Sequence, residues 1–318
     1  MHPDAARELK ARILERLPES YEPSSVPREY GAPWPRIAVG LRPTDDGAKV
    51  AVRLQRDADR ALLPDLGPAA QAEVEVRVIG RVHSLTSPGQ LQRRVRPLRP
   101  GLSVAHPTVS AGTLGGFVRV RTRLALLSNN HGLAGGNAAT AGDAVLQPGP
   151  ADGGTANDRV ATLTAFTRLV GGRPNLVDAA VATLDEGVSA DPGALPGGPL
   201  PGPVPDDLDI DPDEAVEKVG RTSGHTVGLI TAVEVDGVAV QYDGAVYRFD
   251  DQIEIAGRAG AFSAGGDSGS VIWRSRDRAP IGLLFAGSDT GGVGGTGVTF
   301  ANPLSTVLST LGAEWVGD

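Results

Sequence analysis

The sequence predicts a mainly β protein preceded by a small unit of mixed α and β structure. Glycine and proline are frequent in the 318-residue chain, with 43 and 25 residues, and show no collagen-like period. This composition is typical of many short strands joined by tight turns. From about residue 110 onward, short apolar segments recur at close spacing, which indicates β-barrels or a β-sandwich.

The small α+β unit is expected to span residues 1–95. Asp4 can cap a helix whose apolar residues form one stripe, and a proline ends this helix. Residues 37–41 and 49–54 flank a T-D-D-G turn, which predicts a hairpin, and the alternating segment 73–82 predicts a strand. The unit is interpreted as a regulatory, docking or pro-segment-like module.

A basic segment and a proline–glycine run divide the rest of the chain. Four arginines within residues 93–102 are interpreted as a solvated connector, with a proteolytic processing site as the alternative. A run of prolines and glycines then separates two β halves of similar size, and a closing helix is predicted from about Pro303. The predicted boundaries are 96–110 for the linker, 111–318 for the β domain, 111–188 for its first half, 189–211 for the proline–glycine run and 212–318 for its second half with the helix.

The composition excludes several classes of function. The net charge of −8 disfavours nucleic acids and anionic membranes as partners. The chain has no cysteine, which rules out disulfides, thiolate metal sites and a cysteine nucleophile. The charged N-terminus does not resemble a signal peptide, and no stretch is as long and apolar as a membrane span. We expect a cytoplasmic protein without a cofactor, a metal, a nucleic-acid partner or a membrane partner.

The stretch G-G-D-S-G-S at residues 265–270 is the first candidate for chemistry. One apolar strand segment precedes it and another, S-V-I-W, follows it, so the backbone must turn sharply between them. Ser268 is the candidate nucleophile. The amides of Gly266 and Ser268 can point at one place and form an oxyanion hole, in which one donor is typically worth about 3–4 kcal/mol.

A serine hydroxyl needs a base before it can act as a nucleophile. The chain has five histidines, and two of them, His131 and His225, lie within the two β halves. His131 follows the strand segment L-A-L-L-S and opens into a glycine-rich loop, where a base can face a cleft. His225 occupies a predicted hairpin turn, where an exposed polar residue is expected without any function. His131 is therefore the predicted base.

The base needs an acid to fix its tautomer, and three aspartates are candidates. Asp178 begins the strand segment D-A-A-V-A-T-L and is favoured. Asp158 begins D-R-V-A-T-L and remains the main alternative, whereas Asp185 ends the strand after Asp178 and is expected in a turn. The order His131, Asp178, Ser268 differs from the orders found in α/β-hydrolases and subtilisins.

The motifs L-L-S-N-N-H, V-D-A-A-V-A-T-L and G-G-D-S-G-S resemble, in order and spacing, those of the trypsin/chymotrypsin-like serine peptidase family. The stretches G-D-A-V-L-Q-P-G and V-G-R-T-S-G are similar to a bacterial, cysteine-free, intracellular subset, to which the plant narrow-leaf protein is also similar. The resemblance implies two antiparallel six-stranded-type β-barrels of chymotrypsin-like architecture with the site between them. It implies that His131 is the base, Asp178 its orienting acid and Ser268 the nucleophile, with the amides of Gly266 and Ser268 binding the oxyanion.

The resemblance also suggests where a protein or peptide substrate binds. Residues 283–288, L-L-F-A-G-S, match the strand that pairs with the substrate backbone and walls the specificity pocket. Phe262 stands at the position of the pocket floor, so the acid expected for arginine or lysine specificity is missing, although Asp289 lies near this strand. The predicted substrate-binding residues are Phe262, Phe285, Ala286, Gly287 and Ser288.

Two functions follow from these patterns. The favoured one is a trypsin-like serine endopeptidase, and the resemblance adds a regulated intracellular switch, for example one that activates a defence effector. The alternative is a peptidase-fold binding or sensor module with little proteolysis until an activating partner docks through residues 1–95. The family's alanine pair is replaced here by Asn129 and Asn130, and no processed N-terminus is available to pair with Asp267. The activation mechanism of digestive relatives therefore does not carry over.

Overall fold

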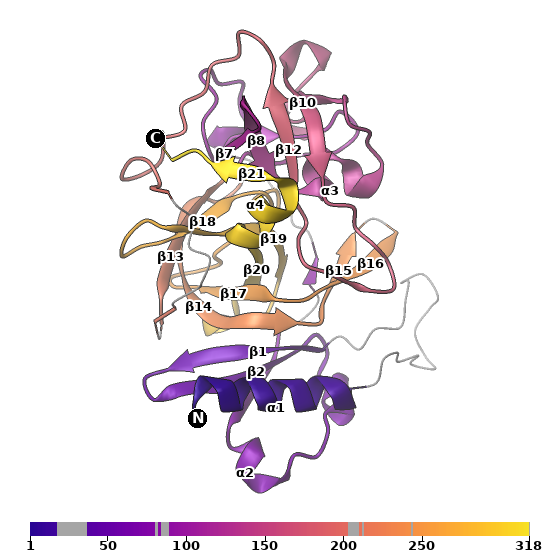
Figure 1. The fold of residues 1–318 in the computed structure, drawn as a ribbon, viewed down its shortest axis with the longest axis vertical. Helices are drawn as coiled ribbons and strands as arrows, with labels where there is room; N and C mark the ends of the chain where they lie inside the picture. The colour runs from indigo at the N-terminus through magenta and orange to yellow at the C-terminus, as the bar shows by residue number, and fades with distance from the viewer. Residues whose placement is uncertain are drawn as a thin grey trace.

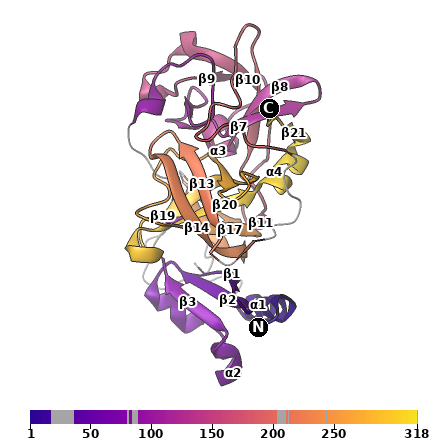
Figure 2. The same cartoon turned by 90° about the vertical axis from the view of Figure 1, so that its left-hand side faces the viewer.

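The computed structural model describes residues 1–17, 37–79, 82–83, 89–202, 210–211, 213–242 and 244–317. The chain is mainly β, with a helix near each end, and the predicted fold class is confirmed. Figures 1 and 2 show three layers stacked along the long axis, with the N-terminal unit at one end, the second β half in the middle and the first β half at the other end.

Six strands of the second half close into an antiparallel barrel. Each strand pairs with two neighbours, and the last in the ring, β18, pairs back to the first, β13. A closed barrel has no unpaired strand edge within its ring, and buried side chains such as Val216, Ile255 and Ile272 pack together as one cluster. The strands, in their order around the ring, are β13 (Ala215–Gly220), β14 (Gly224–Asp236), β17 (Gln252–Gly257), β20 (Val298–Pro303), β19 (Pro280–Ser288) and β18 (Val271–Arg274).

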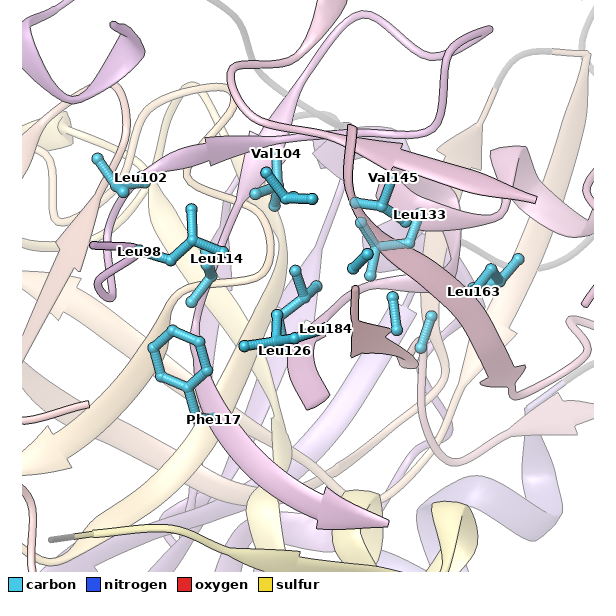
Figure 3. Packing of buried hydrophobic residues seen from close by; sticks show 14 of the residues in the cluster. Leu98, Leu102, Val104, Leu114, Phe117, Leu126, Leu133, Val145, Leu163 and Leu184 are labelled. Carbon is cyan, nitrogen blue, oxygen red and sulfur yellow. The ribbon is translucent and has the colours of Figure 1, made fainter. Parts of the chain in front are cut away.

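The first half is a six-stranded antiparallel sheet around its own core. Figure 3 shows the buried side chains of this core, among them Val104, Phe117 and Leu126. A single bridge between Ala105 and Leu146 links the sheet to the short pair β5 (Ser103–Val104) and β6 (Gly112–Thr113). The strands of the sheet, in order, are β21 (Ala313–Trp315), β7 (Gly116–Val120), β8 (Arg123–Ser128), β12 (Ala180–Leu184), β10 (Arg159–Phe166) and β9 (Ala144–Leu146).

The C-terminal segment joins the two halves. The predicted closing helix is α4 (Leu304–Leu311), and it packs its buried leucines in one cluster with residues of both halves, such as Leu127 and Trp273. After α4 the chain returns to the first half, where β21 pairs with β7. The expected boundary at residue 212 therefore does not separate the halves completely, because a strand of three residues leaves too short a pattern to detect in the sequence.

The N-terminal unit consists of α1 (Pro3–Arg16), β1 (Ile37–Thr44), β2 (Gly47–Leu54), the short helix α2 (Gly67–Gln71) and β3 (Val74–Val78). The strands β1 and β2 form the predicted hairpin, and buried residues of α1 pack against it. The helix begins two residues earlier than expected, and the ring of His2, rather than the side chain of Asp4, accepts the capping hydrogen bond. The strand predicted at 73–82 ends at Val78, and a separate strand, β4 (Val82–His83), follows it.

The N-terminal unit is built into the second half rather than tethered to it. β1 pairs antiparallel with β14, so the two sheets are continuous. Nε of Arg53 on β2 lies 2.9 Å from the carboxylate of Glu254 on β17, and both side chains are fully buried. Glu75 on β3 contacts the same guanidinium at 3.0 Å. Removing one of these partners would leave the opposite charge buried and unpaired, so the ion pairs link β2 and β3 to β17 in a defined register.

The basic segment predicted as a solvated connector is packed against the first half. Leu98 and Leu102 are fully buried in its core, and the guanidinium of Arg96 donates to the side chain of Gln147. The prediction of a solvated connector rested on the arginines, whereas the segment is held against the first half by its buried leucines. Of the proline–glycine run, Leu200 is buried and accepts a hydrogen bond from the Trp315 indole, while residues 203–209 fall outside the described part of the chain.

The helices of the structure are short. None of those in the described ranges is long and apolar enough to cross a membrane.

Candidate active site

His131 is placed by the turn that follows β8. This strand ends at Ser128, and the single helical turn α3 (Asn130–Leu133) carries His131 at its second position. The two asparagines before the histidine anchor this turn: the Asn129 amide donates to the Asp178 carbonyl at 2.6 Å, and the Asn130 amide donates to the Thr167 carbonyl at 2.6 Å. Both asparagines of the L-L-S-N-N-H motif therefore hold the turn that carries His131.

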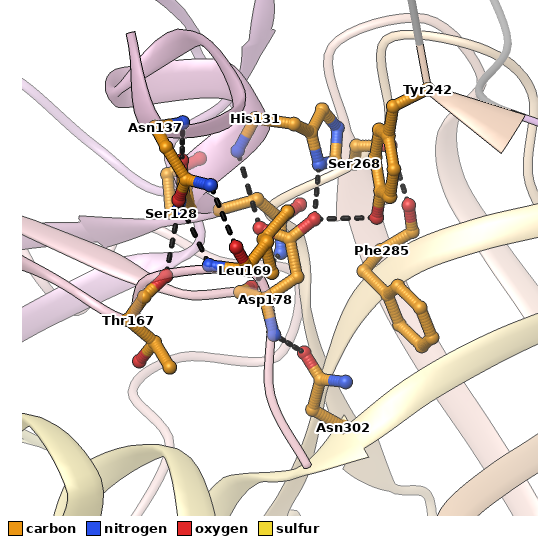
Figure 4. A network of polar contacts seen from close by, with 12 residues as sticks. Ser128, His131, Asn137, Thr167, Leu169, Asp178, Tyr242, Ser268, Phe285 and Asn302 are labelled. Atoms are coloured by element: carbon orange, nitrogen blue, oxygen red, sulfur yellow. Dashed lines mark hydrogen bonds and ion pairs between the residues drawn. The ribbon is translucent and has the colours of Figure 1, made fainter. Parts of the chain in front are cut away.

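Asp178 lies just before β12 and faces the His131 ring. Its carboxylate lies 2.5 Å from His131 Nδ1 and accepts the His131 backbone N–H at 3.2 Å (Figure 4). The side chain is fully buried, and its backbone N–H donates to the side chain of Asn302 at 2.9 Å. Burial by itself raises the pKa of Asp178, but the His131 charge and hydrogen bonds from His131 and Tyr242 outweigh it and lower the pKa below its ordinary value. The group is therefore an ionised carboxylate at neutral pH.

The other two aspartates point elsewhere. Asp158 forms a capping box with Thr155 and an ion pair with Arg94, and Asp185 pairs with Arg159. The structure therefore brings Asp178, and neither of its alternatives, to the predicted base.

Tyr242, at the end of β15 (Val238–Tyr242), is a third partner of this pair. Its hydroxyl donates to the Asp178 carboxylate at 2.6 Å, and its ring centroid lies 5.1 Å from that of His131. Burial, followed by the negative charge of Asp178, raises the pKa of Tyr242 far above its ordinary value, so the hydroxyl keeps its proton. Tyr242 is not predicted from the sequence, because a tyrosine in an alternating strand has the pattern of an ordinary core residue.

Ser268 comes from the second half and meets the pair at the contact between the halves. Its side chain is largely buried, and its backbone carbonyl accepts the N–H of Thr113 in β6 at 2.7 Å. The Ser268 hydroxyl donates to the Phe285 carbonyl at 3.3 Å (Figure 4). Among the described residues no hydrogen bond joins this hydroxyl to His131, and catalytic hydrogen bonds are often long or misaligned without substrate.

The loop around Ser268 leaves two amides available. Within the described part of the chain, the N–H groups of Gly266 and Ser268 donate to no acceptor, whereas those of Asp267 and Gly269 do. Gly266 has φ of +80°, and a Cβ atom there would lie 2.1 Å from the Arg221 guanidinium. Only glycine fits this position, and the resulting turn leaves two donors beside the nucleophile.

A buried ion pair holds the same loop from below. The Asp267 carboxylate accepts the N–H groups of Thr222 and Ala264, each at 2.9 Å, and lies 3.1 Å from Nζ of Lys218 on β13. Burial lowers the pKa of Lys218, and the charge of Asp267 opposes that shift. The ammonium group of Lys218 is thus the cation that pairs with Asp267. This partner was not predicted, although a lysine at an alternating position of the strand A-V-E-K-V-G is a signal that the sequence contains.

The predicted substrate-binding residues divide into two groups. Phe262 is buried among the apolar side chains of the second barrel, where its ring centroid lies 5.7 Å from the Lys218 ammonium. The other four lie consecutively on β19. Phe285 packs its ring against Phe249 with centroids 4.6 Å apart, while the Ser288 hydroxyl donates to the Thr290 carbonyl. Four of the five residues therefore lie on the strand whose Phe285 carbonyl accepts the Ser268 hydroxyl, and the fifth, Phe262, is buried in the apolar cluster of the barrel.

His225 and His106 make local contacts. His225 pairs with Glu217 at 2.6 Å, and His106 lies 3.3 Å from Asp143. In the ranges that the structure describes, no three histidine, aspartate or glutamate side chains are grouped so that they could hold a metal ion.

Comparison with known proteins gives distant structural likenesses. No protein-family model matches the sequence, and neither does any curated protein. Among solved structures, Protease A of Thermobifida fusca is 17% identical, covers 70% of this chain and 99% of its own, and has a TM-score of 0.47. A glutamic acid specific serine protease with a histidine triad in substrate binding is 20% identical over 69% of this chain and 100% of its own, with a TM-score of 0.48. A Nocardiopsis protease is 16% identical over 69% and 98%, also with a TM-score of 0.48.

Proposed function

We propose that the protein is a serine endopeptidase that cuts a protein or peptide substrate through Ser268, His131 and Asp178. The observation that carries the proposal is the buried Asp178 carboxylate, 2.5 Å from the His131 ring, at the contact where the Ser268 loop enters from the other half. A buried carboxylate that fixes a histidine beside a serine is the arrangement that activates a hydroxyl nucleophile.

Each residue then has a defined step. When the Ser268 hydroxyl turns from the Phe285 carbonyl toward His131, the imidazole takes its proton as the oxygen attacks the substrate carbonyl. Asp178 holds the ring and stabilises its positive charge, while the amides of Gly266 and Ser268 donate to the negative carbonyl oxygen. His131 returns the proton to the leaving amine, and water releases the acyl group by the same route in reverse.

The strand β19 supports peptide binding next to this chemistry. Its residues 285–288 run away from the nucleophile, and an extended peptide can add to such a strand through backbone hydrogen bonds. Because Phe262, an uncharged residue, stands at the position predicted for the pocket floor, that position provides no acid to pair with a basic side chain. We therefore propose that the enzyme recognises an extended backbone and does not require arginine or lysine before the cut.

The regulatory part of the proposal concerns the N-terminal unit. We propose a cytoplasmic protease, in keeping with the absence of cysteine, that is active by itself and is stimulated further when a partner docks on residues 1–95. The alternative, a sensor module with little proteolysis until that partner docks, is favoured by one observation: the Ser268 hydroxyl donates to Phe285 rather than to His131.

Cleavage of a defined peptide pool tests the catalytic proposal. Wild-type protein, Ser268→Ala and the control Ser309→Ala, which removes an exposed hydroxyl on α4, are compared by mass spectrometry of the products. We expect wild type and the control to give the same cuts and Ser268→Ala to give none. Identical cuts by Ser268→Ala would rule out Ser268 as the nucleophile.

A further inference from the structure

The strand β4 pairs with β19, the strand whose Phe285 carbonyl accepts the Ser268 hydroxyl. It is placed between two strands of the second half, antiparallel to β19, with His83 opposite Gly287 and Val82 opposite Ser288, and parallel to β15, with His83 opposite Gln241. The pairing order is β15, β4, β19. A segment that follows the N-terminal unit in sequence thus becomes part of the sheet that carries the predicted substrate-binding residues.

The pairing with β4 occupies part of one edge of β19. β20 covers one side of β19 along its length, from Gly282 to Gly287. The opposite side meets β18 as far as Leu283, then the Ser268 loop, whose Gly269 N–H donates to the Leu284 carbonyl at 2.8 Å. β4 takes the next positions, Gly287 and Ser288. It therefore continues the same edge immediately beyond the nucleophile.

The direction of β4 is that of a bound peptide. Because it is antiparallel to β19, the chain passes Ser288 first and Gly287 second, and so advances toward Phe285. The Phe285 carbonyl accepts the Ser268 hydroxyl, so β4 runs toward the nucleophile. Adding a strand to an exposed sheet edge is how many domains bind extended peptides, with the backbone supplying affinity.

We propose that β4 occupies, within the same chain, the strand position that a substrate backbone needs, and so acts as an internal competitor. The proposal rests on the proposed function, since it takes this edge to be the substrate edge. Its partner class is an extended peptide backbone, and its regulator is the N-terminal unit that precedes β4.

Two described residues that bracket β4 in the sequence, Ile79 and Leu98, are held in place, which makes the competitor effective. On one side Ile79 is buried, its N–H donates to the Leu54 carbonyl at 2.8 Å, and its carbonyl accepts the Thr290 hydroxyl at 2.9 Å. On the other side Leu98 is fixed in the core of the first half. A segment held this way reaches an effective concentration of the order of millimolar, which a free peptide must overcome.

Peptide binding measured without turnover tests this inference. The protein is Ser268→Ala, and the probe is a fluorescein-labelled peptide of residues 79–88, I-G-R-V-H-S-L-T-S-P, followed by fluorescence polarisation. Successive residues of a strand direct their N–H groups to opposite sides, so replacing Val82 and His83 together with proline removes the donor toward β19 whichever residue makes it. Replacing both with alanine is the matched control, because it keeps the backbone donors.

We expect the variant with two prolines to bind the probe about tenfold more tightly than Ser268→Ala, because in Ser268→Ala the strand β4 competes at an effective concentration of the order of millimolar. The variant with two alanines should bind the probe as Ser268→Ala does. Equal affinities for the proline and alanine pairs would overturn the inference. Hydrogen exchange on Ser268→Ala itself provides a test that needs no change in β4: slow exchange at Val82 and His83 is expected, and exchange at the rate of an unpaired chain would overturn it. Because neither readout needs catalysis, a failure of the proposed function would show only in the cleavage assay.

Discussion

Removing the Tyr242 hydroxyl tests whether the base depends on more than the Asp178 carboxylate. In Tyr242→Phe the ring stays and only the donor to the buried carboxylate is lost. That donor lies 2.6 Å from the carboxylate oxygen that also faces His131 Nδ1. The change therefore acts on the pair His131–Asp178 and on no substrate contact.

The size of the effect follows from the hydrogen bond itself. A hydrogen bond to a charged group contributes about 1.5–3 kcal/mol, and each 1.36 kcal/mol in a barrier is about tenfold in rate. If the full contribution is expressed in the transition state, kcat falls by about 10- to 150-fold, while KM stays as it is. The hydrogen bond also lowers the pKa of Asp178 and holds its carboxylate toward His131, so its loss leaves the ring less firmly oriented.

Steady-state kinetics on one peptide substrate measures kcat and KM. Tyr247→Phe is the control, since this neighbouring ring lies 5.8 Å from Tyr242 and its hydroxyl has no hydrogen bond to Asp178 in the structure as described. We expect the control to keep the wild-type kcat. An unchanged kcat in Tyr242→Phe would refute the reasoning, and a rise in KM alone would assign Tyr242 to substrate binding instead.

Three further variants test other parts of the molecule. Lys218→Met leaves the Asp267 carboxylate buried without its cation, a loss that costs about 3–5 kcal/mol, so the melting temperature should fall markedly; an unchanged value would contradict the role of the pair. Gly266→Ala puts a carbon atom 2.1 Å from a guanidinium nitrogen at φ of +80°, which should displace an oxyanion donor and lower kcat about 100-fold at similar KM, and normal kcat would count against the oxyanion loop. Burial raises the pKa of Glu75, but the charges of Arg53, Arg77 and Arg42 together outweigh burial and lower the pKa. The stability that this carboxylate adds is therefore present above its ordinary pKa and lost as the pH falls through the folded-state value. In urea unfolding, wild type and Glu75→Gln should therefore converge in acid, whereas a difference that is independent of pH would be inconsistent with the ion pair.

Patterns local in the sequence predicted much of the fold. The hairpin β1–β2, the helix α4 and the short strands of both halves each carry their own periodicity or turn residues, so propensity and burial agree there. Elements made of only two or three residues could not be predicted from the sequence. The strand β21 has three residues and β4 has two, and their positions depend on partners far away in the chain.

The candidate site divides in the same way. The motifs around His131 and Ser268 were visible because glycines and asparagines mark turns. The choice between Asp178 and Asp158 stayed open, because both begin similar strands and only the pairing of strands decides which carboxylate reaches the histidine. Tyr242 could not be found, since 64 residues separate it from Asp178 and nothing in its own strand distinguishes it.

The placement of Phe262 at the floor of the specificity pocket stays a prediction. Its ring is buried, because an aromatic ring next to apolar strands gains free energy by leaving water. The same preference places the leucines of the basic segment in the first half, despite the arginines around them.

Locating the site of labelling by a fluorophosphonate probe tests the central claim most directly. The probe is small and reacts with a serine only when a base and oxyanion donors activate it, so it needs no peptide-binding edge. Wild type, Ser268→Ala and His131→Ala are labelled in parallel and digested, and the modified peptide is found by mass spectrometry. The account predicts one adduct on Ser268 in wild type, none in Ser268→Ala and strongly slowed labelling in His131→Ala. A folded wild-type protein that stays unlabelled, or equal labelling of all three proteins, would contradict it.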